Sequence, residues 1–175
     1  FSYLVPYSRF ATNWQVIDTK GKPVASVEKQ TLAENIPQGF DSVRTDRRSF
    51  SWRADKPATL VWAQAQDNGS MKTDVPFHDF VYSWKAPFNS EPKLFAKVER
   101  RFAGIEWAND NVAMLSDWRF SDRKIRTQII NPENPDGPRV LFNERSYNDA
   151  YNDPGNFVYE QTEFGTRAVK VVGER

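Results

Sequence analysis

The sequence contains no cysteine, and His78 is the only histidine among its 175 residues. The absence of cysteine excludes disulfides, thiolate metal sites and a cysteine nucleophile. One imidazole without any thiol cannot form a typical zinc site, so we expect neither a metal nor a cofactor. The compartment stays open, a periplasmic or secreted location included, because many exported proteins also have no disulfides.

The chain also lacks an excess of charge and any long apolar run. Lys and Arg number 24 against 23 Asp and Glu, so the formal net charge is +1 and no general attraction to nucleic acid is expected. No stretch reaches the roughly 18 apolar residues of a membrane-spanning helix. Residues 1–9 lack the pattern of a signal peptide. The chain starts with Phe, from which we expect an excised or processed piece of a larger protein.

Short alternating or apolar runs separated by turn residues dominate the sequence. The 11 prolines and 8 glycines are spread along the chain, which is typical of turns between strands. The one helical candidate, residues 31–36, is too short to be stable alone and is followed by Pro37 and Gly39. We therefore predict a single all-β domain over 1–175, with residues 31–47 as a connection.

A repeat organises the middle of the chain. Trp52 ends an alternating strand that is followed by a polar turn and an apolar strand, and Trp107 stands in the same context. A second predicted hairpin, with a proline just before its final strand, follows each of these. The repeat predicts two antiparallel four-stranded units, at 48–99 and at 102–145. Their size and strand count are those of propeller blades.

Both ends of the chain have the pattern of half a unit. Residues 1–30 contain the last two strands of a predicted preceding blade, and residues 156–173 contain the first two strands of a following one. The expected fold is a partial β-propeller of half a blade, two blades and half a blade. A single β-sandwich of about twelve strands is the alternative. Terminal hairpins would expose unpaired strand edges in the propeller, so we expect the chain to self-associate.

Several segments resemble one known family. They are Phe1-Ser2-Tyr3-Leu4-Val5-Pro6, Leu32-Ala33-Glu34-Asn35-Ile36-Pro37, Ser42-Val43-Arg44, Arg48-Ser49-Phe50-Ser51-Trp52-Arg53-Ala54-Asp55-Lys56-Pro57-Ala58-Thr59-Leu60-Val61-Trp62, Ala65-Gln66-Asp67-Asn68-Gly69, Arg123-Lys124-Ile125-Arg126-Thr127 and Tyr151-Asn152-Asp153-Pro154-Gly155. These segments are similar to the propeller of glutamyl endopeptidase-like members of the prolyl oligopeptidase family of serine peptidases. The resemblance is spread over nearly the whole chain.

This resemblance implies an N-terminal propeller followed by an α/β-hydrolase domain with a Ser-Asp-His triad. The sequence departs from the family because it lacks the Gly-x-Ser-x-Gly nucleophile elbow of that domain. His78, beside Asp79 in a predicted loop, could act as a base only with an activated serine. We therefore expect no catalytic residue in this chain and a catalytic domain outside it.

The implied function is that of the non-catalytic propeller portion of a serine peptidase, of the glutamyl endopeptidase or dipeptidyl peptidase type. Such a portion gates access for peptide substrates to a separate hydrolase domain and excludes folded proteins. The alternative is an autonomous propeller-like or sandwich scaffold that binds protein or glycan through exposed aromatic side chains.

Arginines are the candidates for contact with an acidic substrate. A guanidinium can bind a carboxylate through two hydrogen bonds, which suits a family associated with cleavage after glutamate. Structural or solvated arginines are the alternative. A basic patch that stacks on nucleic acid is a further interpretation of Arg44, Arg47, Arg48 and Arg53, which are interleaved with Phe50 and Trp52, but the neutral total charge argues against it. The candidate substrate-binding residues are Arg48, Arg53, Arg119 and Arg123.

Two polar segments have a functional and a structural interpretation. Residues 148–155 offer oxygen ligands for calcium, but they lack the glycine and closing glutamate of a calcium loop, so we predict a structured loop. Asn68-Gly69-Ser70 matches a glycosylation sequon, but Asn-Gly between strands chiefly indicates a tight turn.

Overall fold

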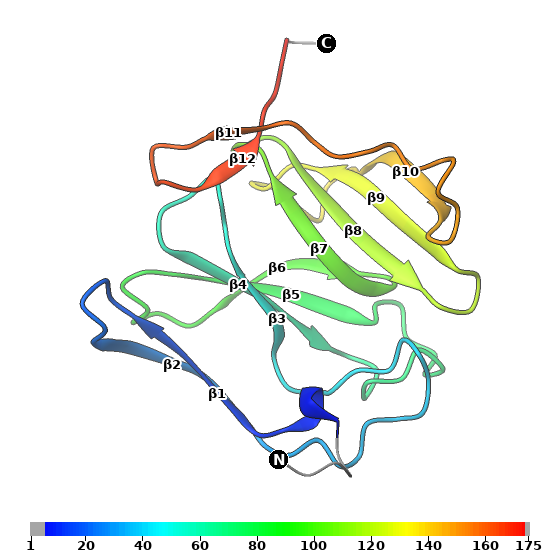
Figure 1. The fold of residues 1–175 in the computed structure, drawn as a ribbon, viewed down its shortest axis with the longest axis horizontal. Helices are drawn as coiled ribbons and strands as arrows, with labels where there is room; N and C mark the ends of the chain where they lie inside the picture. Colours follow the sequence, from blue (N-terminus) through cyan, green and yellow to red (C-terminus); the bar gives the residue numbers. More distant parts are fainter. Residues whose placement is uncertain (1–5, 174–175) are drawn as a thin grey trace.

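The structure is a computed structural model that describes residues 6–173, in which twelve strands form four antiparallel sheets (Figure 1). A 3-10 turn at Tyr7–Arg9 precedes them, and the described residues contain no α-helix. The strands are β1 (Thr12–Ile17), β2 (Pro23–Gln30), β3 (Arg48–Trp52), β4 (Thr59–Ala65), β5 (Asp79–Lys85), β6 (Lys93–Val98), β7 (Arg101–Trp107), β8 (Ala113–Arg119), β9 (Lys124–Ile130), β10 (Val140–Ser146), β11 (Tyr159–Gln161) and β12 (Arg167–Val169). Residues 1–5 of the Phe1–Pro6 segment lie outside the described part of the chain.

Two sheets of four strands occupy the middle of the chain, in the orders β3-β4-β5-β6 and β7-β8-β9-β10. Strands that are consecutive in sequence are neighbours in each sheet, and all pairs are antiparallel. Trp52 pairs with Leu60 in the first sheet, and Trp107 pairs with Ala113 at the corresponding position in the second. The predicted all-β class and antiparallel four-stranded sheets are confirmed. The two hairpins β1-β2 and β11-β12 form sheets of two strands each.

The sheets stack face to face in the order in which the chain forms them (Figure 1). Val61 and Ala63 of β4 belong to the core between the two four-stranded sheets. Leu60 and Trp62, which alternate with them, pack toward Val16 and Val27 of the β1-β2 hairpin. Because β4 is covered on both faces, its first five residues are all buried.

The segment between β2 and β3, residues 31–47, contains neither a helix nor a strand. It is held to the sheets by hydrogen bonds. Val43 N donates to Gly69 O at 3.0 Å, and the carbonyl oxygen of Asp41 accepts a bond from Arg101 Nε at 2.9 Å. In the described part of the chain, no helix is long and apolar enough to cross a membrane.

The Asn-Gly turn lies against this connection. Asn68 and Gly69 have positive φ values of 55° and 80°, and Ser70 N donates to Asp67 O at 3.1 Å, as in a tight turn. A Cβ at Gly69 would stand 2.1 Å from the carbonyl oxygen of Val43. The position therefore needs glycine for its close approach to the connection as well as for its φ.

Gly69→Ala is expected to destabilise the chain much more than Gly21→Ala. Both glycines have nearly the same φ, 80° and 81°, so both alanines incur the same left-handed backbone cost of about 1 kcal/mol. Nothing lies within 4 Å of a Cβ at Gly21, whereas the clash with Val43 should raise the cost at Gly69 to about 3 kcal/mol or more. Urea denaturation measures both values, and equal losses would contradict the tight approach.

Candidate functional site

A cluster of ionisable side chains is buried where the loop before β5 meets the beginning of β7. Asp67 and Asp79 are 0% exposed and Arg101 is 1% exposed. Nη2 of Arg101 donates to Asp67 Oδ2 at 2.6 Å, and its Nη1 donates to Asp79 Oδ1 at 2.9 Å. Arg48 donates to the second oxygen of Asp79, and His78 Nδ1 lies 2.7 Å from Asp67 Oδ2. Two arginines thus neutralise two carboxylates that have no access to water.

Backbone donors complete the coordination of both carboxylates. Gly69 N donates to Asp67 Oδ1 at 2.9 Å, and Phe102 N donates to Asp79 Oδ2 at 2.7 Å. Every carboxylate oxygen of the cluster therefore accepts hydrogen bonds from the protein itself. This saturation is typical of a structural cluster and leaves no oxygen free for a metal or substrate.

His78 lies in the predicted loop, but its ring partner is Asp67 and not the adjacent Asp79. Asp79 instead begins β5 and faces the two arginines. In the described residues the His78 ring has no hydroxyl partner. The geometry is thus that of an anchored side chain and not of a base beside a nucleophile.

The pKa of Asp67 lies below its usual value. Burial alone would raise this pKa, but hydrogen bonds from Arg101 and His78 lower it by more. The contribution of this carboxylate to stability is therefore present above the unfolded-state pKa of about 4. It is lost as the pH falls through the lower, folded-state value.

Two of the predicted substrate-binding arginines are engaged inside the protein. Arg48 bonds Asp79 in the buried cluster. Arg53 is 8% exposed, and it binds both oxygens of Asp55, at 3.0 and 2.6 Å. Its guanidinium carbon lies 4.3 Å from the ring centroid of Trp107, so it packs between the two large sheets.

The other two predicted arginines lie together at the β8-β9 turn. The Arg119 side chain is 41% exposed, and its Nη2 donates to Asp122 Oδ2 at 2.6 Å. This hydrogen bond lowers the pKa of Asp122 to about 2. Arg123 has no carboxylate partner in the described part of the chain, and its Nη1 donates to the neutral hydroxyl of Tyr147 at 3.3 Å.

The Arg123 guanidinium belongs to an exposed stack. Its carbon lies 3.6 Å from the centroid of Phe120, and Phe120 stacks on Phe40 at 4.2 Å. Phe40 is 79% exposed. The side chain of Asp41 accepts a hydrogen bond from Phe120 N at 3.0 Å, while its carbonyl oxygen accepts one from Arg101. We name Phe40, Phe120 and Arg123 the arginine–phenylalanine stack.

Sequence reasoning identified Arg123 but missed the rest of this stack. The contact joins residues of the 31–47 connection to a turn far away in the sequence, and neither segment has the alternation of apolar and polar residues that indicates a strand.

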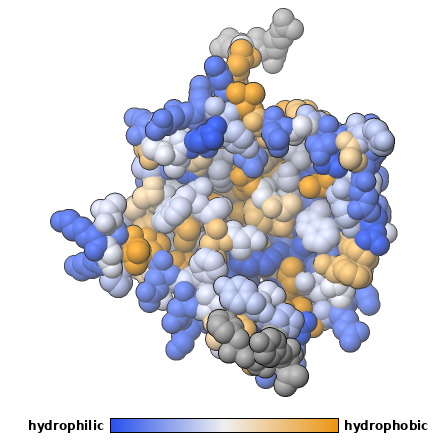
Figure 2. All heavy atoms as spheres, in the orientation of Figure 1, coloured by the Kyte–Doolittle hydropathy of each residue, from blue (hydrophilic) through white to orange (hydrophobic). Residues whose placement is uncertain are grey.

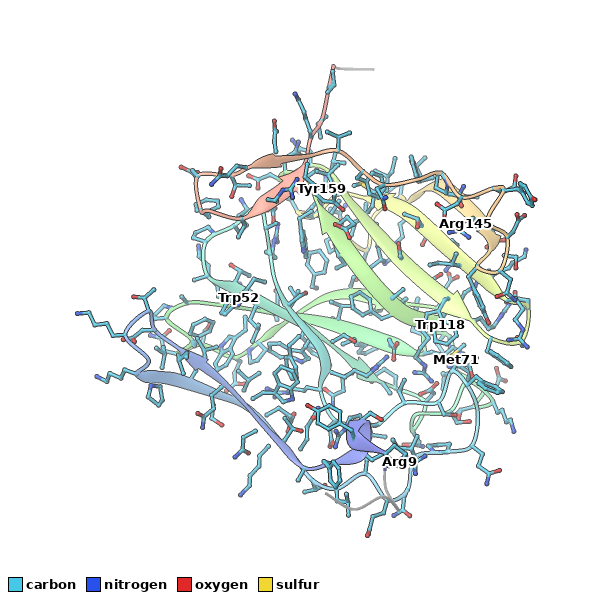
Figure 3. The ribbon with its side chains drawn as sticks, viewed as in Figure 1. Arg9, Trp52, Met71, Trp118, Arg145 and Tyr159 are labelled. Atoms are coloured by element: carbon cyan, nitrogen blue, oxygen red, sulfur yellow. The ribbon has the colours of Figure 1, made fainter. Side chains whose placement is uncertain are left out.

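Trp118, which packs against Tyr147 with ring centroids 6.0 Å apart, marks this end of β8 in Figure 3. The backbone of Arg123 has a φ of 59°, a left-handed conformation that glycine or asparagine adopts more easily.

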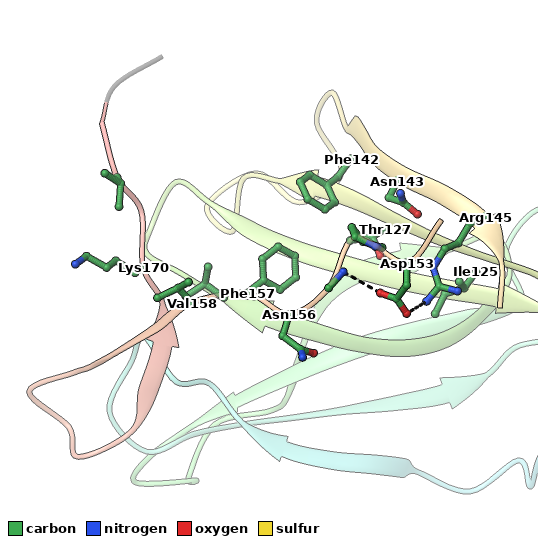
Figure 4. A pocket seen from close by; sticks show the side chains of 14 residues that line it. Ile125, Thr127, Phe142, Asn143, Arg145, Asp153, Asn156, Phe157, Val158 and Lys170 are labelled. Atoms are coloured by element: carbon green, nitrogen blue, oxygen red, sulfur yellow. Dashed lines mark hydrogen bonds and ion pairs between the residues drawn. The ribbon is translucent and has the colours of Figure 1, made fainter. Parts of the chain in front are cut away.

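The loop at 148–155 uses its carboxylates for its own backbone. Asp149 accepts a hydrogen bond from Tyr151 N at 3.0 Å, and Asp153 accepts one from Gly155 N at 2.9 Å. Asp153 also binds Arg145 at 2.6 Å, at the edge of a groove of about 600 Å³ over β9 and β10 (Figure 4). Across the described part of the chain, no three His, Asp or Glu side chains group into a potential metal site.

Asp67→Asn is expected to lower the free energy of unfolding at pH 7 by about 3–5 kcal/mol, because Arg101 loses one of its two buried anionic partners. The difference from the wild type should shrink as the pH falls from 4 toward 2, because the wild-type carboxylate then becomes protonated. Urea denaturation across this pH range measures both effects.

Asp110→Asn is the control for this experiment, because Asp110 forms an exposed pair with Lys56. Exposed pairs contribute little, so this variant should stay close to the wild type. A wild-type-like Asp67→Asn protein at pH 7 would show that the buried cluster does not hold the fold.

No protein-family model matches the chain, and no solved structure matches it significantly. Two curated proteins are similar to it. One is the probable chloroplastic glutamyl endopeptidase of Oryza sativa subsp. japonica, to which it is 38% identical over an alignment of 175 positions that covers 98% of the chain. The other is the protein of the same name from Arabidopsis thaliana, with 39% identity over an alignment of 172 positions that covers 97% of the chain. The chain spans 19% and 18% of these two relatives. It is therefore similar, along nearly its whole length, to one part of two proteins that are named probable glutamyl endopeptidase.

Proposed function

We propose that the chain is the non-catalytic propeller portion of a serine peptidase of the prolyl oligopeptidase family. The observation that carries the proposal is its identity of 38% to a probable glutamyl endopeptidase over nearly all of its residues. In this proposal, residues 48–99 and 102–145 are two complete blades, while 1–30 and 156–173 belong to two further blades. The hydrolytic triad is supplied by a separate domain.

Contacts among the hairpin turns support a radial arrangement of the sheets. Lys56 in the β3-β4 turn pairs with Asp110 in the β7-β8 turn. The hydroxyl of Thr166, directly before β12, donates to the carbonyl oxygen of Ala54 in the β3-β4 turn at 2.5 Å, although 112 residues separate the two in sequence. The first hairpins of three successive sheets thus converge at their turns, as blades do around a propeller axis.

The proposed role of this portion is selection of substrate. A propeller beside a hydrolase active site admits short or unfolded peptides and excludes folded proteins. The proposal assigns no catalytic part to His78, Asp67 or Asp79, whose hydrogen bonds are directed at one another and at the backbone. Selection by shape needs a rigid fold, and four stacked antiparallel sheets supply one.

Recognition of an acidic side chain is assigned in this proposal to Arg123, with Arg119 beside it. Arg48 is paired with Asp79 and Arg53 with Asp55, so the charge of each is already neutralised inside the protein. Arg123 has a neutral hydrogen-bond partner and keeps its charge free for an incoming carboxylate. Phe120 and Phe40 fix the guanidinium plane in advance and offer an apolar surface to the peptide.

The full-length protein is expected to cleave peptides after glutamate, and the 175-residue chain alone is expected to be inactive on the same peptides. The measurement is release of product from fluorogenic peptides that contain Glu or, as a control, Gln. Cleavage by the isolated chain would refute a non-catalytic role. Absence of activity in a folded full-length protein would favour the scaffold alternative.

Arg123→Gln in the full-length protein is expected to lower kcat/KM for Glu peptides by about 10- to 100-fold, the equivalent of one lost charge-assisted interaction. The rate for Gln peptides should change little, because the missing charge matters only to an anionic side chain. Arg167→Gln is the matched control, since Arg167 also lies over an aromatic ring, that of Tyr159. Equal losses on Glu and Gln peptides would assign Arg123 a structural role.

A further inference from the structure

We propose that a small pocket between the two large sheets binds a small organic anion, either a carboxylate or a phosphate ester. The guanidinium of Arg139 and the ammonium of Lys97 bind its anionic group, and its apolar part lies against the ring of Phe77. We name this site the Arg139 pocket. It shares no residue with the arginine–phenylalanine stack, and the inference is independent of the proposed peptidase function.

The Arg139 pocket is lined by residues of both large sheets, and all four strands of each sheet are present. The first sheet contributes Lys97 of β6, and the second contributes Gln128 of β9 and Arg139, directly before β10. Gln128 faces the first sheet, because Ile130, two residues further along β9, belongs to the core between the sheets. The volume of about 340 Å³ is at the lower end of the range for small-molecule sites. The other lining residues are Phe77, Glu99 and Asp136.

Backbone carbonyl oxygens hold the guanidinium of Arg139 in place. Its Nε and Nη2 donate to Pro135 O at 3.3 and 3.2 Å, and Nη2 also donates to Lys97 O at 2.9 Å. The bond to Lys97 crosses from the second sheet to the first. These bonds orient the guanidinium, but they leave its charge without a counterion, since a carbonyl oxygen carries no net charge.

No carboxylate of the described residues forms a hydrogen bond with Arg139. Oδ1 of Asp136 lies 3.8 Å from its Nη2, which is beyond hydrogen-bond distance, and the Asp136 side chain is 54% exposed. Glu99 accepts a bond from Arg126 at 3.1 Å instead. The Arg139 side chain is only 17% exposed. Burial therefore lowers the pKa of Arg139, and the carboxylates of Asp136 and Glu99 raise it by less.

The more deeply buried arginines of the protein have a different environment. Arg101 donates to two carboxylates, and Arg53 donates to both oxygens of Asp55. Figure 2 shows many hydrophilic side chains on one face of the molecule, so a charge at the surface does not by itself mark a site. Arg139 combines burial with hydrogen bonds to carbonyl oxygens alone, and this combination is the observation that carries the proposal.

Lys97 supplies a second cation to the pocket. Its Nζ lies 5.8 Å from the centroid of the Phe77 ring, and it forms no ion pair within the described part of the chain. The Phe77 ring is an apolar wall beside the two cations, and the side-chain amide of Gln128 adds a neutral hydrogen-bond donor. Two cations, one amide and one aromatic ring suit a small anion that has an apolar part.

Benzoate and phenyl phosphate are the probes for this pocket, and benzamide is the neutral counterpart of benzoate with nearly the same shape. The full-length protein should bind at least one of the two anions with a Kd of about 1 mM or below, and benzamide about 10-fold more weakly or less. Ligand-observed saturation-transfer NMR measures each Kd. Tighter binding of phenyl phosphate would assign the pocket to phosphate esters, and tighter binding of benzoate would assign it to carboxylates.

Arg139→Gln and Lys97→Met should each weaken binding of the anion by about 10- to 100-fold. Lys97→Met keeps an apolar side chain beside Phe77, so it tests the charge even if Arg139→Gln does not fold. Lys93→Met is the matched control, because Lys93 is also on β6 but does not line the pocket, and it should bind like the wild type. Near-ultraviolet circular dichroism checks that each variant is folded.

Arg123→Gln should also leave binding of the anion unchanged, which separates the Arg139 pocket from the arginine–phenylalanine stack. The proposal is overturned if the wild type binds neither anion or binds benzamide as tightly as the anions. It is also overturned if folded Lys97→Met binds like the wild type, or if binding is lost in Arg123→Gln but kept in Arg139→Gln. Cleavage of Glu peptides tests the proposed function separately.

Discussion

The described structure depends on the burial of the Arg101 guanidinium. A cation at 1% exposure cannot be accommodated without anionic partners, because its desolvation costs several kcal/mol. Asp67 comes from the loop before β5 and Asp79 from the first position of β5, while Arg101 begins β7. The charges are neutralised only when the loop, the first sheet and the second sheet are in place together. The cluster therefore couples the position of one sheet to the position of the next.

The same guanidinium also organises the surface. Its Nε is bonded to the carbonyl oxygen of Asp41, and the side chain of Asp41 is bonded to Phe120 N. Phe40, directly before Asp41, stacks on Phe120. The guanidinium of Arg123 lies over the other ring, that of Phe120. The exposed stack is thus two hydrogen bonds away from the buried guanidinium of Arg101. A surface formed by loops needs this kind of support if its geometry is to persist.

Sequence reasoning succeeded where structure follows from local pattern. Alternation of apolar and polar residues placed the hairpins, and the repeated tryptophans at 52 and 107 occupy corresponding positions in two sheets. Their environments nevertheless differ, since Trp107 is 4% exposed and Trp52 is 46% exposed. Trp107 packs on Phe95 of the preceding sheet, whereas Trp52 lies beside a hairpin of two strands. Burial depends on the neighbouring layer, which a local pattern does not describe.

Contacts between distant segments were beyond the reach of the same reasoning. His78 is adjacent to Asp79 in the sequence, but it binds Asp67, because residues that alternate along a strand face opposite sides and the loop folds back. The sequence alone could not tell which of the four candidate arginines is neutralised inside the protein. Their hydrogen-bond partners in the structure distinguish them. Arg53 has Asp55 two positions away, whereas the partner of Arg48 lies on a different strand.

Net charge near zero conceals a local imbalance at Arg123. With 24 basic and 23 acidic residues, nearly every arginine of the described structure could in principle meet an internal acid, and most do. Arg123 does not, since its hydrogen-bond partner is a phenol and its backbone adopts a φ that costs free energy for a side chain with a Cβ. A strained, unneutralised cation on an exposed aromatic stack contributes little to stability. In the proposed function, this charge is the one that meets an acidic side chain of the substrate.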